Sequence, residues 1–151
     1  MPADPYFVDV AVRWSDMDAY GHVNNVAFVR LLEDARVYAL RDWFGQDRDL
    51  IDDGLLVVRQ EIDYLAPLTF DYRPARITMG CSRISGASFD IGYAVGRPEG
   101  DVTYAVAEVT LVAYDLQRST PRRLTETERA QLCAIAGDPA PLRSRGTRAP
   151  R

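Results

Sequence analysis

The sequence contains no lysine, and all 18 of its basic residues are arginine, against 22 acidic residues in a chain of 151. The resulting net charge of −4 argues against nucleic-acid binding. We interpret the arginine-only usage as a coding bias, although guanidinium groups suit anionic ligands where geometry matters. No apolar run approaches the roughly 20 residues that cross a bilayer, so we expect a soluble protein that binds neither nucleic acid nor membrane.

Cysteine and histidine are also scarce. Cys81 and Cys133 are the only cysteines, and we interpret both as reduced, buried thiols because no metal-ligand residues lie near either one. His22 is the only histidine, and one histidine among scattered carboxylates has no recognisable metal-ligand spacing. The sequence therefore predicts no metal and no cofactor. The polar, acidic start is unlike a signal peptide, so the expected location is the cytoplasm.

Apolar residues are arranged in clear periodic patterns. Residues 6–14 alternate with a period of two, which predicts a half-buried strand. Apolar residues then recur at helical spacing up to Gly45, with Asn24 or Asn25 placed to cap the helix start. Alternating patterns return further along the chain and predict four long strands, over residues 55–65, 75–84, 89–95 and 102–114.

The C-terminal part divides in two. A capping box over residues 125–128 predicts a short helix to about Ala136. Residues after Gly137 are rich in proline, arginine and serine and lack apolar periodicity. We therefore predict a single domain over residues 1–137 and a basic, disordered tail over residues 138–151.

The order of these elements indicates an α+β class. One strongly apolar helix followed by a run of long strands favours a curved antiparallel sheet wrapped around that helix, although a helix-capped sandwich has a similar pattern. An open sheet exposes its edge strands, and such edges are usually paired. We therefore expect a homodimer that continues the sheet.

The polar loop before the apolar helix carries the candidate chemistry, because Asp16, Asp18 and His22 all lie in it. A helix N-terminus presents unpaired N–H groups and the positive end of the helix dipole, which stabilise an anion or an oxyanion. A carboxylate beside such a helix end suits acyl transfer. The same residue types also occur in ordinary capped turns, and spacing alone leaves both interpretations open.

The loop resembles the signature of a known family. Residues 13–25, Arg-Trp-Ser-Asp-Met-Asp-Ala-Tyr-Gly-His-Val-Asn-Asn, followed by Leu-Glu-Asp-Ala-Arg at 32–36, resemble the hydroxybenzoyl-CoA thioesterase family, which has Asp-x-Asp-x-x-Gly and then Glu-x-x-Arg. Residues 56–68 resemble the family's second strand and residues 107–114 its last. The resemblance covers about residues 6–118. It implies a hot-dog fold, in which a curved antiparallel sheet wraps around one long central helix.

The same resemblance implies function and site residues. It implies hydrolysis of an acyl-CoA or acyl-carrier-protein thioester by a homodimer or homotetramer, with Asp18 as the nucleophile or general base. Backbone N–H groups near Asn24 and Asn25 are expected to polarise the thioester carbonyl, and Asp16 to order the loop. Arg59 and Tyr64 are expected to face the cleft or the subunit interface. The residues predicted to bind substrate are Gly21, His22, Asn24, Asn25, Glu33, Arg36, Val58 and Arg59.

Two departures from the family pattern refine these expectations. Asn25 stands where some members have histidine, and an asparagine cannot accept a proton near neutrality. The histidine of this chain, His22, lies three residues earlier and does not take over that role. The helix end rather than His22 is therefore expected to assist Asp18. The turn over residues 83–88 contains Arg83 as its only basic residue, whereas some relatives bind CoA phosphates there. A non-catalytic acyl-CoA-binding module and a hot-dog hydratase or dehydratase are the alternatives.

Overall fold

The computed structural model describes residues 4–45 and 54–146. Its centre is a six-stranded sheet with the order β1-β3-β4-β5-β2, and the short β6 pairs with β5. Every pairing in this sheet is antiparallel. The strands are β1 (Tyr6–Val10), β2 (Gly54–Tyr64), β3 (Ala75–Ile84), β4 (Ser88–Gly96), β5 (Ala105–Asp115) and β6 (Thr120–Pro121).

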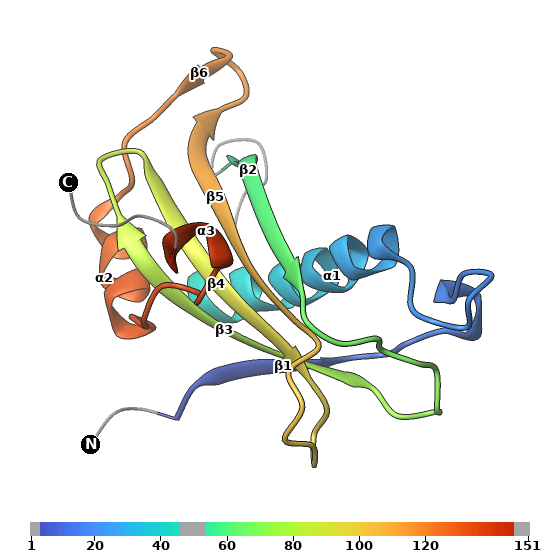
Figure 1. Cartoon of the computed structure of the whole chain (residues 1–151). Helices are drawn as coiled ribbons and strands as arrows, with labels where there is room; N and C mark the ends of the chain where they lie inside the picture. Colours follow the sequence, from blue (N-terminus) through green and yellow to red (C-terminus); the bar gives the residue numbers. More distant parts are fainter. Residues whose placement is uncertain (1–3, 46–53, 147–151) are drawn as a thin grey trace.

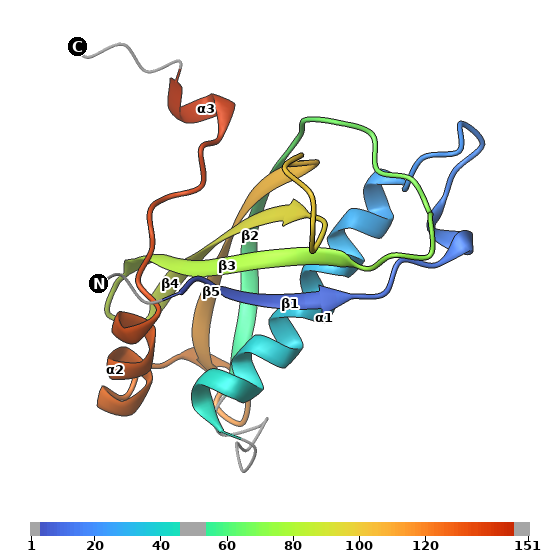
Figure 2. The same cartoon turned by 90° about the horizontal axis from the view of Figure 1, so that it is seen from below.

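One long helix, α1 (Asn25–Phe44), lies along the concave face of this sheet (Figures 1 and 2). It begins at Asn24, whose side-chain oxygen accepts a hydrogen bond from the N–H of Val26 at 2.8 Å. It ends at Gly45, where the backbone has a positive φ of 91° that glycine adopts without strain. The face of α1 turned to the sheet is buried and consists of Phe28, Leu31, Leu32, Ala35, Arg36, Ala39 and Trp43.

The sheet contributes the other half of the core through alternate residues. In β3 and β4 the inward side chains are almost fully buried, while most of their outward neighbours are partly exposed. The predicted α+β, hot-dog architecture is therefore confirmed. The first strand is shorter than predicted because the chain turns into a 3-10 helix, η1 (Trp14–Asp16). The inward residues of the two strands are Ala75, Ile77, Met79, Cys81, Phe89, Ile91, Tyr93 and Val95.

Strand β2 forms one end of the sheet and contains a bulge. Its register with β5 shifts between Val57 and Arg59, so Val58 has no partner in the ladder. Beyond the bulge, side chains alternate between the two faces of the sheet. Glu61 and Asp63 lie on one face, and Ile62 and Tyr64 lie on the other. Only one of these two sets of side chains can therefore reach a site beside α1.

The C-terminal part differs from the prediction. The capping box is present, and Thr125 and Glu128 start α2 (Glu126–Ala134) as expected. Residues 138–146, which we expected to be disordered, instead cross the sheet and end in α3 (Arg143–Gly146). Ala140 and Leu142 are buried against the sheet, so isolated apolar residues hold a segment that has no periodic pattern. Residues 147–151 of the predicted tail lie outside the described residues.

Two further features concern cysteine and membranes. Cys81 is buried as expected, but Cys133 lies exposed on α2. Burial raises the pKa of the Cys81 thiol to about 11, so this cysteine is a packing residue. Among residues 4–45 and 54–146, no helix combines the length and the hydrophobicity that a membrane span requires.

Candidate active site

The loop before α1 is closed on itself like a small hairpin. Met17 and Val23 form an isolated antiparallel bridge, and the N–H of Asp18 donates to the carbonyl of His22 at 2.8 Å. Gly21 turns the chain with a positive φ of 73°, a conformation that a side chain disfavours. The N–H of Val23 donates to the carbonyl of Leu68 at 2.7 Å and so ties the loop to the segment after β2. The loop therefore presents Asp18 at a defined position.

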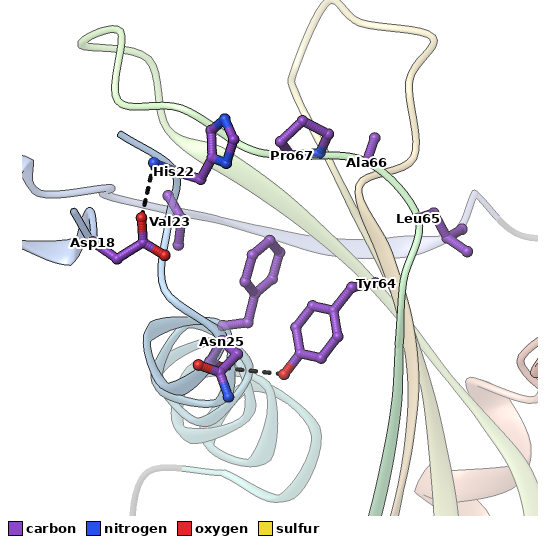
Figure 3. Close-up of a pocket in the computed structure, with 9 residues that line it drawn as sticks. Asp18, His22, Val23, Asn25, Tyr64, Leu65, Ala66 and Pro67 are labelled. Carbon is purple, nitrogen blue, oxygen red and sulfur yellow. Dashed lines mark hydrogen bonds between the residues drawn. The ribbon is translucent and has the colours of Figure 1, made fainter. Parts of the chain in front are cut away.

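The two oxygens of Asp18 have different surroundings. Oδ1 accepts hydrogen bonds from the N–H groups of Tyr20 at 2.9 Å and His22 at 3.4 Å. Oδ2 accepts none from the residues that the structure describes. One oxygen thus holds the carboxylate in place, and the other is available to a ligand. Figure 3 shows this carboxylate at the rim of the cleft beside α1.

Asp16 has a structural role, as predicted. It is only 4% exposed, and its Oδ2 accepts from the backbone of Arg13 at 2.7 Å and from the guanidinium of Arg30 at 2.7 Å. Burial alone raises the pKa of Asp16, but the hydrogen bonds from Arg13 and the charge of Arg30 outweigh it and hold this pKa below its ordinary value. The carbonyl of Asp16 also accepts the N–H of Asn24 at 2.9 Å, so this residue connects the loop to the helix start.

The first turn of α1 leaves backbone donors available. The N–H of Val26 is bonded to the Asn24 side chain, and that of Phe28 to the Asn24 carbonyl. The N–H groups of Asn25 and Ala27 have no acceptor within the described part of the chain. Unpaired first-turn amides carry the positive end of the helix dipole. They are the type of donor that stabilises an oxyanion.

Asp18 and the start of α1 share one cleft of about 360 Å³. Its opposite wall is the end of β2 and the following residues. The hydroxyl of Tyr64 donates to the carbonyl of Asn25 at 3.2 Å, and its ring packs edge-to-face on Phe28 with centroids 5.3 Å apart (Figure 3). Burial raises the pKa of Tyr64, so the phenol stays protonated. The cleft is lined by Asp18, His22, Val23, Asn25, Phe28, Tyr64, Leu65, Ala66 and Pro67.

His22 lines this cleft, but its ring does not face Asp18. Only its backbone N–H bonds the carboxylate, while the imidazole points away from Asp18 and toward the side of Pro67 (Figure 3). This orientation agrees with the expectation that His22 is no proton-transfer partner of Asp18. Gly21 and Asn24 act through the backbone, one by shaping the turn and the other by capping the helix.

The other predicted substrate-binding residues lie elsewhere. Glu33 is exposed on α1, whereas Arg36 is buried and its guanidinium donates to the Tyr93 hydroxyl at 3.4 Å. Val58 occupies the bulge of β2 and is 59% exposed. Arg59 follows the bulge on the outer face of the sheet. None of these four residues is among those that line the Asp18 cleft.

Charged groups on the outer sheet face pair with one another. Arg59 contacts Glu108 at 3.4 Å and also pairs with Glu61. Arg83, the only basic residue of its turn, binds Asp90 at 2.6 Å. The guanidinium of Arg83 is thus already engaged by a carboxylate. Within the described ranges, no group of histidine, cysteine and carboxylate side chains is arranged to hold a metal ion.

The sequence patterns indicate neither the wall formed by residues 65–67 nor the place of Phe28, an apolar residue of the helix, in the cleft. The signal was present in part, since residues 56–68 carry the resemblance to the family's second strand. The proline after an exposed apolar stretch marks where β2 ends and the chain turns along the cleft. No periodic pattern indicates that this turn faces the helix start.

Comparison with known proteins gives a consistent result. The model of the thioesterase-like superfamily matches residues 12–143. A thioesterase from Thermus thermophilus, solved with coenzyme A and Zn, is 28% identical, with a TM-score of 0.72 over 92% of this chain and 100% of that chain. The PA5185 protein of Pseudomonas aeruginosa is 25% identical, with a TM-score of 0.79 over 89% and 93%. A 1,4-dihydroxy-2-naphthoyl-CoA thioesterase from Synechocystis is 19% identical, with a TM-score of 0.75 over 86% and 96%, which shows a shared fold.

Proposed function

The chain belongs to the thioesterase-like superfamily, and on that basis we propose that it hydrolyses acyl-CoA thioesters with Asp18 as the reacting carboxylate. The single observation that carries this assignment is that Asp18 Oδ2 and the unpaired N–H of Asn25 belong to residues lining the same cleft. A base or nucleophile beside an oxyanion donor is the arrangement that acyl transfer requires.

In the general-base route, Asp18 takes a proton from a water molecule as the water oxygen bonds to the thioester carbonyl carbon. The carbonyl oxygen becomes an oxyanion beside the amides of Asn25 and Ala27. Collapse of this intermediate breaks the carbon–sulfur bond, and the proton leaves with the thiol. In the nucleophilic route, Oδ2 itself attacks the carbonyl carbon, the carbon–sulfur bond breaks and CoA leaves as its thiolate. Water then hydrolyses the resulting mixed anhydride to the free acid and restores the Asp18 carboxylate. Both routes use the same carboxylate oxygen and the same helix end.

Coenzyme A is the preferred carrier of the acyl group in this proposal. The thioesterase of T. thermophilus, which shares the fold, was solved with coenzyme A. The apolar wall of Val23, Phe28 and Leu65 suits the acyl part of the substrate, because burying apolar surface is favourable. An acyl-carrier-protein thioester presents the same reacting bond, and a direct comparison of the two carriers distinguishes them.

We propose in addition that the enzyme is a homodimer or homotetramer whose sheet continues across β2. Strand β2 ends the sheet order, and an end strand presents unpaired backbone groups. Its residues Leu56, Val57 and Val58 are 39%, 39% and 59% exposed, which places apolar side chains along this edge. A second copy that pairs there covers both the backbone groups and the side chains.

The test is a panel of acyl-CoAs with different chain lengths and aromatic groups, assayed for release of free thiol. Hydrolysis of at least one member, with equal amounts of acid and thiol formed, is the expected result. Tight binding without thiol release indicates a binding module instead. An enoyl-CoA that loses its ultraviolet absorbance without thiol release has been hydrated, and this result indicates a hydratase.

A further inference from the structure

The segment after α2 begins its path at the open end of β3. Strand β1 pairs with β3 only as far as Met79, so the edge beyond that residue is unoccupied by β1. There the N–H of Cys81 donates to the carbonyl of Ile135 at 2.9 Å, and the N–H of Gly137 donates to the carbonyl of Cys81 at 2.8 Å. We call residues 135–146 the C-terminal strap. Its first residues are thus anchored as a short parallel bridge.

The strap then crosses the outer face of the sheet, opposite α1 (Figures 1 and 2). Gly80 and Gly92, which face each other in the ladder of β3 and β4, make room for it. A Cβ atom added at Gly80 would lie 3.4 Å from the Ile135 carbonyl oxygen, and one added at Gly92 would lie 3.4 Å from the Ala140 nitrogen. The two glycines thus form a shallow track in which the strap backbone lies close to the sheet.

The middle of the strap is held by apolar contact. Ala140 is 5% exposed and Leu142 is 3% exposed, and both pack on Val106 of β5 with Ala94 of β4 beside them. These residues form a small cluster separate from the main core. The strap is therefore part of the folded domain, and its position is set by specific contacts.

The end of the strap binds the outward side chains of β2. The N–H of Arg143 donates to Asp63 Oδ2 at 2.6 Å, and the hydroxyl of Ser144 donates to the carboxylate of Glu61. Arg145 pairs with Glu108 of β5, which is only 3% exposed. Arg59 contacts the other oxygen of Glu108 at 3.4 Å, so the strap supplies the second cation to a buried carboxylate. Removing one cation from a buried carboxylate is costly, which favours the docked strap.

The alternation of side chains along β2 connects these strap contacts with the active-site cleft. Glu61 and Asp63 face outward, and the alternate residues Ile62 and Tyr64 therefore face the side of α1. Tyr64 is the last residue of β2 and bonds the carbonyl of Asn25, in the helix turn that carries the unpaired amides. The main contacts of β2 within the sheet are with β5, so the strap is a second support for the end of the strand.

We propose that the C-terminal strap is a positioning element for catalysis: by holding Glu61 and Asp63 from outside, it fixes Tyr64 and the first turn of α1 inside. This inference rests on the proposed thioesterase function. It assigns no chemical step to the strap, which acts through the Tyr64–Asn25 contact. A small displacement of groups that orient the reacting atoms lowers turnover strongly even when the fold persists.

The test compares three chains: the full chain, one ending at Gly146 as the matched control, and one ending at Gly137. We expect the control to keep the full kcat/KM with the best acyl-CoA of the panel. The chain ending at Gly137 should lose about tenfold in kcat/KM, mainly in kcat, because the oxyanion donors are misplaced rather than removed. Hydrogen exchange at the backbone of residues 61–64 should become faster in this chain only.

A double-mutant cycle separates positioning from general support. If the strap acts through Tyr64, the loss caused by Tyr64→Phe is large in the full chain and small in the chain ending at Gly137. Equal kcat/KM in the folded short and full chains overturns the proposal. The proposal also fails if Tyr64→Phe lowers kcat/KM by the same factor in both chains. If the full chain releases no thiol, the thioesterase assignment fails instead. Exchange at residues 61–64 then still decides whether the strap supports β2.

A second variant covers the case in which the short chain does not fold. Gly92→Val keeps the whole chain and places a side chain in the track, against Ala140. Valine suits an extended strand, so β4 is expected to form while the strap is displaced. The same faster exchange and the same loss in kcat are expected. Unchanged exchange and unchanged kcat in a variant whose strap is displaced contradict the proposal.

Discussion

Asp16 and Asp18 lie two residues apart in one loop, yet Asp16 is buried between the cations of Arg13 and Arg30 and Asp18 lines an open cleft. The first carboxylate has donors on both oxygens. The second has donors only on Oδ1. The loop therefore uses one aspartate to hold its shape and presents the other to the cleft.

Asp16→Asn is expected to lower the free energy of unfolding by about 2 kcal/mol, since it places an amide donor against the donors of Arg13 and Arg30. Urea denaturation measures this change. Asp34→Asn is the matched control, because Asp34 also accepts from Arg30 but its side chain is 41% exposed. An exposed pair contributes well under about 1 kcal/mol. Equal effects of the two substitutions contradict the structural role of Asp16.

The contribution of Asp16 should depend on pH with a defined sign. Its pKa in the folded protein is lowered, so the stabilisation is complete above the unfolded-state pKa of about 4 and is lost as the pH falls through the folded-state pKa. The difference in unfolding free energy between the natural chain and Asp16→Asn should therefore shrink in acid. A difference that stays constant from neutral pH to below about pH 3 is inconsistent with this account.

Arg97 should be a main support of the loop that follows the cleft wall. Its side chain is 2% exposed, donates to the carbonyl of Arg73 at 2.7 Å and pairs with Asp71 at 3.0 Å. Arg97→Met keeps most of the volume and removes the donor to the carbonyls of Arg73 and Thr69, at an expected cost of about 2–3 kcal/mol in urea denaturation. Arg118→Met is the control, since the Arg118 side chain is 84% exposed. Equal stability of the two variants refutes this role.

The proposed dimer makes Val57→Glu disruptive. A charge on the edge of β2 opposes pairing with a second copy, so the variant should sediment as a monomer where the natural chain sediments as a dimer or tetramer. Val37→Glu places the same charge on an exposed site of α1 and should leave the assembly unchanged. A natural chain that sediments as a monomer at micromolar concentration contradicts the proposal directly.

Much of this fold follows from local patterns in the sequence. The alternation over residues 75–84 coincides with β3, and the capping residue Asn24 and the terminal Gly45 bracket α1 as expected. These features depend on neighbouring residues, which a single sequence displays. The proposal that Asp18 is the reacting carboxylate rests instead on the resemblance, because the composition and placement of its loop also fit an ordinary turn.

Other features depended on contacts that no local pattern encodes. The strap has no periodicity, and its docking requires the glycines of two other strands to lie side by side. The direction of Arg59 is set by the bulge at Val58, which changes the phase of β2 relative to β5. The burial of Arg36 was not predicted, because α1 carries apolar residues on several sides and periodicity did not show which face meets the sheet.

The central claim is that Asp18 is the reacting carboxylate, and the most direct measurement is thiol release by Asp18→Asn with the best acyl-CoA of the panel. Asp42→Asn is the matched control, because Asp42 lies at the other end of α1 and binds the Tyr6 hydroxyl at 2.6 Å. The account predicts that Asp18→Asn keeps the circular dichroism and melting temperature of the natural chain but loses at least about 100-fold in kcat. Natural turnover by a folded Asp18→Asn protein contradicts it.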